Sequence, residues 1–240
     1  MTALSIIPID GIGEIHPGDA IGPIVLAAAG AQNTPLATGD CLVVTQKIVS
    51  KAEHRLVPLD HDDFEARAEI IASETVRVLR RRGDLVITET RHGFVCANAG
   101  VDLSNVDAGV AALLPLDGDR SAHRIRNAII AATSSDGGVE VGVVISDTFG
   151  RPWRNGLTDV AIGVAGIAAV VDLRGEIDDR GQELRVTEVA LADEIASAAE
   201  LVMGKASGIP VAIVRGLEAS WFRNGSVREL VRAPEDDLFR

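Results

Sequence analysis

Two short polar stretches contain side chains that could bind one divalent cation together. Ser146-Asp147-Thr148 ends an apolar run and places a carboxylate and a hydroxyl where a strand would end. Asp102 lies in a second polar stretch, shortly after the apolar run 94–97. Carboxylate and hydroxyl oxygens are ligands that Mg²⁺ and Mn²⁺ accept readily. The pattern indicates a cation site, although Asp147 could equally be a turn residue and Asp102 a helix cap.

Basic side chains follow two of the apolar runs. Arg151 and Arg154 come shortly after Asp147 and could orient an acceptor carboxylate or a phosphate through bidentate hydrogen bonds. Lys47 and Lys51 follow the apolar run 41–45 and could offset phosphate charge as compact cations. For both pairs, the alternative is an ordinary solvated surface position.

Two glycine-bearing loops bear on a nucleotide site, and the first could bring backbone N–H groups close to a ligand. The first, Gly11-Ile-Gly-Glu-Ile15, lacks the dinucleotide-binding spacing because position 16 is His. The second, Met203-Gly-Lys-Ala-Ser-Gly208, has Gly, Lys and Ser without the spacing of a P-loop. Asn105 could add a hydrogen bond to a base or a phosphate. A nucleotide site in this chain would therefore be neither Walker nor Rossmann in type.

Strands and helices must position these side chains. Apolar runs and turn residues predict strands at 3–9, 41–45, 85–88, 94–97, 139–146 and 210–214. Helical spacing predicts helices at 19–31, 62–82, 123–133 and 191–203. In the 62–82 helix, three arginines would occupy the last turn, where cations suit the helix dipole. The segment 160–171 is rich in small residues and fits either a strand or tight packing.

The order of these elements predicts an α+β fold, because strands and helices mix without a regular βαβ alternation. The 240 residues fit one large domain or two small ones. Turn residues near 115–122 could mark a boundary between two sub-lobes, or an ordinary surface loop.

Composition excludes several classes of protein. Apolar residues make up 47% of the chain, too many for disorder, and the net charge of −12 argues against nucleic acid or an anionic membrane as a partner. Only Cys41 and Cys96 are present, which favours a reducing compartment over a disulfide framework. No signal peptide or membrane span is expected, so we predict a cytoplasmic protein.

Seven stretches, in order, resemble the coenzyme F420-0:L-glutamate ligases, also called F420 gamma-glutamyl ligases. They are GIGEIHPGD (11–19), GDCLVVTQKIVSKAEHRLV (39–57), NAGVDLSNV (98–106), VGVVISDTFGRPWRNG (141–156), AIGVAGI (161–167), ELRVTEVALADEIASAAELVMGK (183–205) and GIPVAIVRG (208–216). The closest resemblance is to the ligase half of the actinobacterial two-domain version, in which a flavin-binding, nitroreductase-like domain follows. A fused or separate domain of that kind is therefore an expected partner.

The resemblance implies one ligase domain over residues 1–240, with a two-lobed mixed fold that is neither Rossmann nor P-loop. It implies that L-glutamate, and then further gamma-linked glutamates, are added to coenzyme F420-0 through an acyl phosphate, with GTP converted to GDP and phosphate. It also implies Mg²⁺ or Mn²⁺, with K⁺ as an additional candidate cation, and a homodimer.

The resemblance also assigns roles to single residues. Asp102, Asp147 and Thr148 match the metal ligands of the family. The nucleotide contacts match Ile12, Gly13, Glu14, Ile15, Gln46, Lys47, Lys51, Asn105, Gly204, Lys205, Ala206, Ser207, Gly208, Ile209 and Pro210. Our own hypothesis makes Arg151 and Arg154 catalytic together with Asp147, as groups that orient the acceptor.

Two other functions fit the same residues. One is a ligase of the same fold that uses another acyl acceptor or amino acid. The other is a non-catalytic scaffold domain that presents a deazaflavin-binding surface. Product analysis separates the first from the leading hypothesis, and binding of GTP with Mn²⁺ separates the second.

Overall fold

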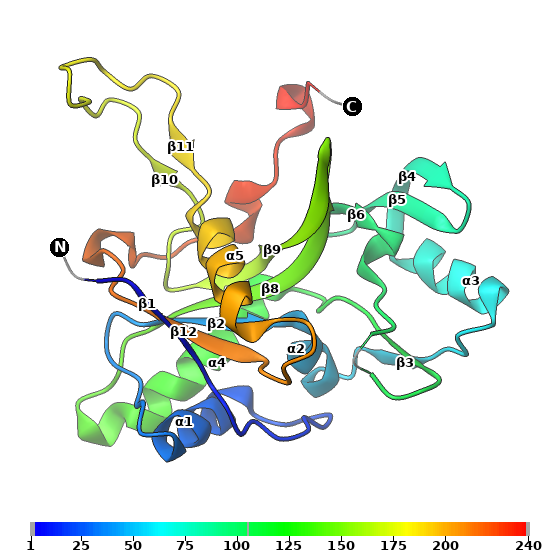
Figure 1. The fold of residues 1–240 in the computed structure, drawn as a ribbon, viewed down its shortest axis with the longest axis horizontal. Coiled ribbons are helices and arrows are strands. Elements are labelled where there is room, and N and C mark those ends of the chain that lie inside the picture. The colour runs from blue at the N-terminus through cyan, green and yellow to red at the C-terminus, as the bar shows by residue number, and fades with distance from the viewer. Residues whose placement is uncertain (1–2, 105, 239–240) are drawn as a thin grey trace.

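A five-stranded mixed sheet forms the centre of the molecule (Figure 1). The computed structural model describes residues 3–104 and 106–238. The strand order is β1 (Ser5–Pro8), β12 (Val211–Arg215), β2 (Cys41–Thr45), β8 (Gly142–Arg151) and β9 (Arg154–Ala165). Only β2 and β8 pair in parallel; the other neighbouring strands are antiparallel. The central strands are rich in Val and Ile, as expected for strands buried on both faces.

Helices cover both faces of this sheet. Alternate residues of β2 point to opposite sides, so Leu42 and Val44 pack with α1 (Ile21–Ala31) and α4 (Gly118–Thr133). Cys41 and Val43 pack with α5 (Leu191–Met203) on the other side. The core is therefore split into two aliphatic layers by the sheet.

A smaller group of elements lies beside this sheet, at the right of Figure 1. It holds α3 (Phe64–Glu74), the sheet of β4 (Thr75–Arg82), β5 (Leu85–Thr90) and β6 (Val95–Ala97), and the pair β3 (Leu56–Pro58) and β7 (Val110–Ala112). The arrangement confirms the predicted α+β fold, which is neither Rossmann nor P-loop. The chain returns to the larger part at α4, within the predicted boundary region 115–122.

The remaining elements are short. They are α2 (Gln46–Ala52), β10 (Val171–Asp172), β11 (Glu188–Val189) and the 3-10 turns Asn98–Gly100, Ser134–Asp136, Ala219–Trp221, Val227–Leu230 and Pro234–Asp236. The β10–β11 arm extends away from the body in Figure 1. Within the described part of the chain, no helix has the length and apolar character needed to cross a membrane.

The predicted helix 62–82 is wrong in its second half. The helix ends at Glu74, and Thr75–Arg82 forms β4, which pairs with β5. Thr75 leaves the helix with extended dihedral angles, and Arg77 pairs with Glu89 of β5 at 2.8 Å. The three arginines therefore lie on a strand. Apolar residues continue at helical spacing past Glu74, but pairing with β5 overrides that local pattern.

Two other strands differ from the sequence-based expectation. The strand predicted at 139–146 begins at Gly142 and continues to Arg151, and it pairs with β9 along most of its length. The segment 160–171, predicted as either a strand or tight packing, is partly each. Residues up to Ala165 belong to β9, and the buried residues Ile167, Ala168 and Ala169 then pack against α5.

The contact between α4 and β9 depends on the absence of side chains. A Cβ atom on Gly163 would lie 2.3 Å from the carbonyl carbon and oxygen of Gly118. Gly163→Ala should therefore lower the free energy of unfolding by about 1–3 kcal/mol, measured by urea denaturation. Gly30→Ala in α1 is the control, since its Cβ would meet nothing within 4 Å and alanine favours the helix. Equal stability of the two variants would contradict this account of the packing.

Candidate functional site

A pocket of about 450 Å³ lies at the carboxyl end of β2, beside the middle of β8. The two strands are parallel and paired, so the residues that follow Thr45 lie beside Asp147 and Thr148 of β8. Loop 12–15, the start of α2 and the segment after α5 complete the walls. The pocket thus brings together four stretches that sequence analysis singled out separately.

Most of the predicted site residues line this pocket. They are Ile12, Gly13, Glu14, Ile15, Gln46, Lys47, Lys51, Asp147, Thr148, Gly204, Lys205, Ala206, Gly208, Ile209 and Pro210. Ser207 lies in the same segment and donates its hydroxyl hydrogen to the carbonyl of Met203. Asn105 lies outside the described residues, so its predicted contact stays a prediction.

Asp147 is half-buried in the pocket wall. Burial raises the pKa of this carboxyl group to about 7, against the lowering effect of a hydrogen bond from the Thr148 amide at 2.8 Å. The negative charges of Asp102 and Asp159 raise the pKa further, and Lys205 opposes them. Burial, with two neighbouring carboxylates, therefore disfavours the ionised form of Asp147.

Asp102 stands beside Asp147 rather than in the pocket lining. Its carboxylate pairs with Lys47 Nζ at 3.0 Å and accepts the Ser104 N–H at 2.7 Å. These contacts lower the pKa of Asp102, although burial alone would raise it. Backbone hydrogen bonds to Ala112 at 2.8 and 2.9 Å fix its position. Asp102 and Asp147 are close enough for their charges to interact, and their binding of one shared cation stays a prediction.

Sequence reasoning missed Asp159, which is buried in the same pocket. It lies opposite Thr148 in the β8–β9 register and accepts hydrogen bonds from the hydroxyls of Ser146, at 2.8 Å, and Thr148. Lys205 in turn donates to the Thr148 hydroxyl. The only available signal was an acidic residue just before the apolar segment 160–171, and strand pairing was needed to place it.

The other basic and polar side chains of the pocket have protein partners. Lys51 forms an ion pair with Glu14, which ties α2 to loop 12–15. The Gln46 amide donates to the Leu113 carbonyl at 3.0 Å, and its oxygen has no hydrogen-bond partner among the described residues. Gln46 therefore supports α2 as well as lining the pocket.

Arg151 and Arg154 lie apart from this pocket. Both are exposed at the tip of the β8–β9 hairpin, and Arg151 donates to the Asn155 carbonyl at 3.2 Å. Neither is among the residues that line the pocket. Their proposed role in orienting the acceptor stays a prediction.

The donor set of the pocket fits a hard divalent cation. No group of three His, Cys, Asp or Glu side chains in the described part of the chain converges as a metal cluster. Asp102, Asp147 and the Thr148 hydroxyl offer oxygen ligands for Mg²⁺ or Mn²⁺, which also accept water and phosphate oxygens. A bound cation would favour the ionised form of Asp147, which burial disfavours in the metal-free protein.

Comparison with known proteins decides the family. A sequence profile described as F420-0:Gamma-glutamyl ligase matches residues 11–216. The coenzyme F420:L-glutamate ligase of Methanothermobacter thermautotrophicus is 42% identical over 253 residues, 99% of each chain. The enzyme of the same name from Methanopyrus kandleri is 40% identical over 258 residues, 100% of this chain and 99% of its own. The chain belongs to the F420-0:gamma-glutamyl ligase family.

Membership confirms the family and the enzyme class, a ligase, expected from the sequence. A third F420:L-glutamate ligase, from Methanocaldococcus jannaschii, is 42% identical over 221 residues, 86% of each chain. The part of this chain that the family profile matches, residues 11–216, includes every residue that lines the pocket, from Ile12 to Pro210. The closer likeness to the actinobacterial two-domain version stays a prediction.

The raised pKa of Asp147 predicts how the stability of the metal-free ligase depends on pH. Folding raises this pKa from its usual 3.8 to about 7, so the folded state disfavours the ionised form. The free energy of unfolding should therefore fall as pH rises from about 4 to about 7, and level off above that. In thermal unfolding with EDTA present, the stability of Asp147→Asn relative to that of the wild type should increase as pH rises across this interval.

Asp84→Asn is the matched control for this experiment, because Asp84 is exposed in the smaller group of elements. Its stability should differ from that of the wild type by a constant amount at all these pH values. A constant difference for Asp147→Asn as well would show that ionised Asp147 carries no cost in the folded protein.

Proposed function

We propose that this chain is a GTP- and divalent-metal-dependent ligase that joins L-glutamate to coenzyme F420-0 and then adds further gamma-linked glutamates. The observation that supports the proposal is that Asp147, Thr148, Lys47 and Lys205 line one pocket, with Asp102 paired to Lys47 beside it. The names of the family and of its relatives supply the acceptor and the amino acid.

Amide formation from a carboxylate needs a better leaving group than oxide. In the proposed reaction, a carboxylate oxygen of F420-0 attacks the γ-phosphorus of GTP, and the bond to the bridging oxygen breaks to release GDP. The amine of L-glutamate then attacks the acyl phosphate. The carbon–oxygen bond breaks, phosphate leaves, and the amine loses a proton as the amide forms. Positioning and charge stabilisation are the main tasks of a protein in such phosphoryl transfer.

The residues of the pocket suit these tasks. Lys47, Lys51 and Lys205 line one cavity and would offset the charge of the transferring phosphoryl group. Asp102, Asp147 and Thr148 would hold Mg²⁺ or Mn²⁺, which supplies positive charge to phosphate oxygens when bound. Loop 12–15 and the segment 204–210 would contact the nucleotide through backbone groups. The ion pair between Lys51 and Glu14 would keep the first of these loops against α2.

The decisive experiment is incubation with F420-0, L-glutamate, GTP and Mn²⁺, followed by mass analysis of the product. The wild type should add glutamate, and Asp147→Ala should slow product formation by about a hundredfold or more, since loss of a metal ligand removes charge stabilisation. Asp84→Asn is the matched control and should keep the wild-type rate. An Asp147→Ala variant with the wild-type rate would disprove the metal role.

The same experiment separates the other functions. Product formed only with another acid or amino acid would indicate a ligase of different specificity. No product, together with no heat of binding for GTP plus Mn²⁺ in calorimetry, would favour the non-catalytic scaffold.

We also propose that the ligase is a homodimer joined through the β8–β9 hairpin. The side chains of Trp153 and Leu157, near the hairpin tip, are 80% and 66% exposed, which is costly for large apolar groups in water. Light scattering should therefore give twice the chain mass at micromolar concentration. Trp153→Ser with Leu157→Ser should shift the protein to the monomer, whereas Leu201→Ser, an exposed position on α5, should not. A monomeric wild type would contradict the proposal.

A further inference from the structure

A second cavity, of about 600 Å³, lies where α4 begins, on the face of the sheet that α1 and α4 cover. We name it the arginine cavity after Arg91, Arg120 and Arg228; Phe94, His123 and Ile162 also line it. Three guanidinium groups around one hollow are unusual in a chain with a net charge of −12.

The acidic residues of this cavity are already committed to the protein. Asp117 caps α4 by accepting the Arg120 N–H at 3.0 Å. Asp119 accepts the Val164 N–H at 2.8 Å and the Ser226 hydroxyl at 2.7 Å. Both carboxylates keep their negative charge, but neither forms an ion pair with an arginine among the described residues, and the three guanidinium groups outnumber them in the lining.

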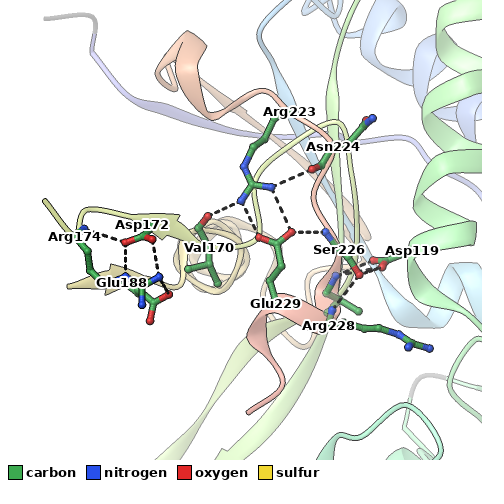
Figure 2. Close-up of polar contacts among 11 residues, drawn as sticks. Asp119, Val170, Asp172, Arg174, Glu188, Arg223, Asn224, Ser226, Arg228 and Glu229 are labelled. Carbon is green, nitrogen blue, oxygen red and sulfur yellow. Dashed lines mark hydrogen bonds and ion pairs between the residues drawn. The ribbon is translucent and has the colours of Figure 1, made fainter. Parts of the chain in front are cut away.

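The guanidinium groups, in contrast, have few acidic partners in the protein. Arg120 and Arg228 are exposed and have no side-chain hydrogen bond or ion pair within the described ranges. Arg91 pairs with Glu74 at 2.7 Å, but Glu74 also pairs with Arg55 at 3.0 Å, so one carboxylate serves two guanidinium groups. Figure 2 shows the side chain of Arg228 pointing away from the contacts that join Ser226, Asp119 and Glu229.

The arginine cavity lies near the ligase pocket, although the two share no lining residue. Phe94 lines the cavity, and its ring centroid lies 6.2 Å from that of Phe149. Phe149 follows Asp147 by two residues on β8, which is about 6.6 Å along a strand. The arginine cavity and Asp147 are therefore close enough for two ends of one extended substrate.

We propose that the arginine cavity binds the oxyanions of the acyl substrate that lie away from its reacting carboxylate. This inference rests on the proposed function and names the place of its acidic acceptor. Guanidinium groups bind phosphate and carboxylate oxygens in bidentate fashion, which suits both anions. The bound anion is either the phosphate of F420-0 or a carboxylate of a glutamate added earlier, and the two sources share this chemistry.

The test compares the double variant Arg120→Gln/Arg228→Gln with the wild type. KM for F420-0, or for the acceptor that already carries one glutamate, should rise about tenfold or more, because each charge-assisted hydrogen bond contributes substantially to binding. The kcat and the KM values for GTP and L-glutamate should stay at wild-type levels. Arg185→Gln is the matched control, since it removes the same charge from an exposed position between β10 and β11.

Each outcome separates the possibilities. A raised KM for both acceptors identifies the phosphate as the bound anion, and a raised KM for the glutamylated acceptor alone identifies the glutamyl carboxylate. Partial recovery in Arg120→Lys/Arg228→Lys would support charge recognition. If the double variant has a normal kcat and unchanged KM values for both acceptors, the arginine cavity does not bind the acceptor, and the proposed ligase function is unaffected. A wild type that forms no product would overturn both.

Discussion

The parallel pairing of β2 with β8 is the constraint on which the site depends. Its register places Thr45 opposite Ser146, so Gln46, at the start of α2, and Asp147, within β8, come next on the two paired segments. These residues are about a hundred positions apart in the chain and meet because β2 ends beside the middle of β8. The antiparallel return of β9 then adds Asp159 opposite Thr148. The order of strands thus assembles the polar groups, and the loops close around them.

The electrostatics of the pocket follow from this assembly. Three carboxylates from three different segments approach one another in a partly buried space, and burial is what raises the pKa of Asp147 most. Lys47 and Lys205 offset this charge in part, through Asp102 and the Thr148 hydroxyl. A protein with an acidic balance overall still gathers three lysines around one pocket, so the local charge there differs from the net charge of the chain.

The sequence predicted the α5 helix, the β2 strand and most of the pocket lining, because each depends on a local pattern of apolar residues or on a family motif. It could not place Asp159, whose partner Thr148 is set by pairing between strands. The prediction from sequence continued the α3 helix through the residues that form β4. Apolar residues at helical spacing cannot show that these residues pair with β5 instead. The sequence also could not show that Arg151 and Arg154 lie at the tip of a long hairpin, because the length of β8 depends on β9.

The carboxylate of Asp119, in the first turn of α4, links parts of the molecule that are far apart in the chain. It accepts hydrogen bonds from the Val164 N–H of β9, from the Ser226 hydroxyl and from the Val227 N–H. Arg228 takes its place beside Arg120 only because that turn is docked there. During synthesis the rim of this hollow cannot exist until the chain has emerged past Arg228 and the turn at Ser226 has folded back against α4, so the cavity forms later than the helix that begins it.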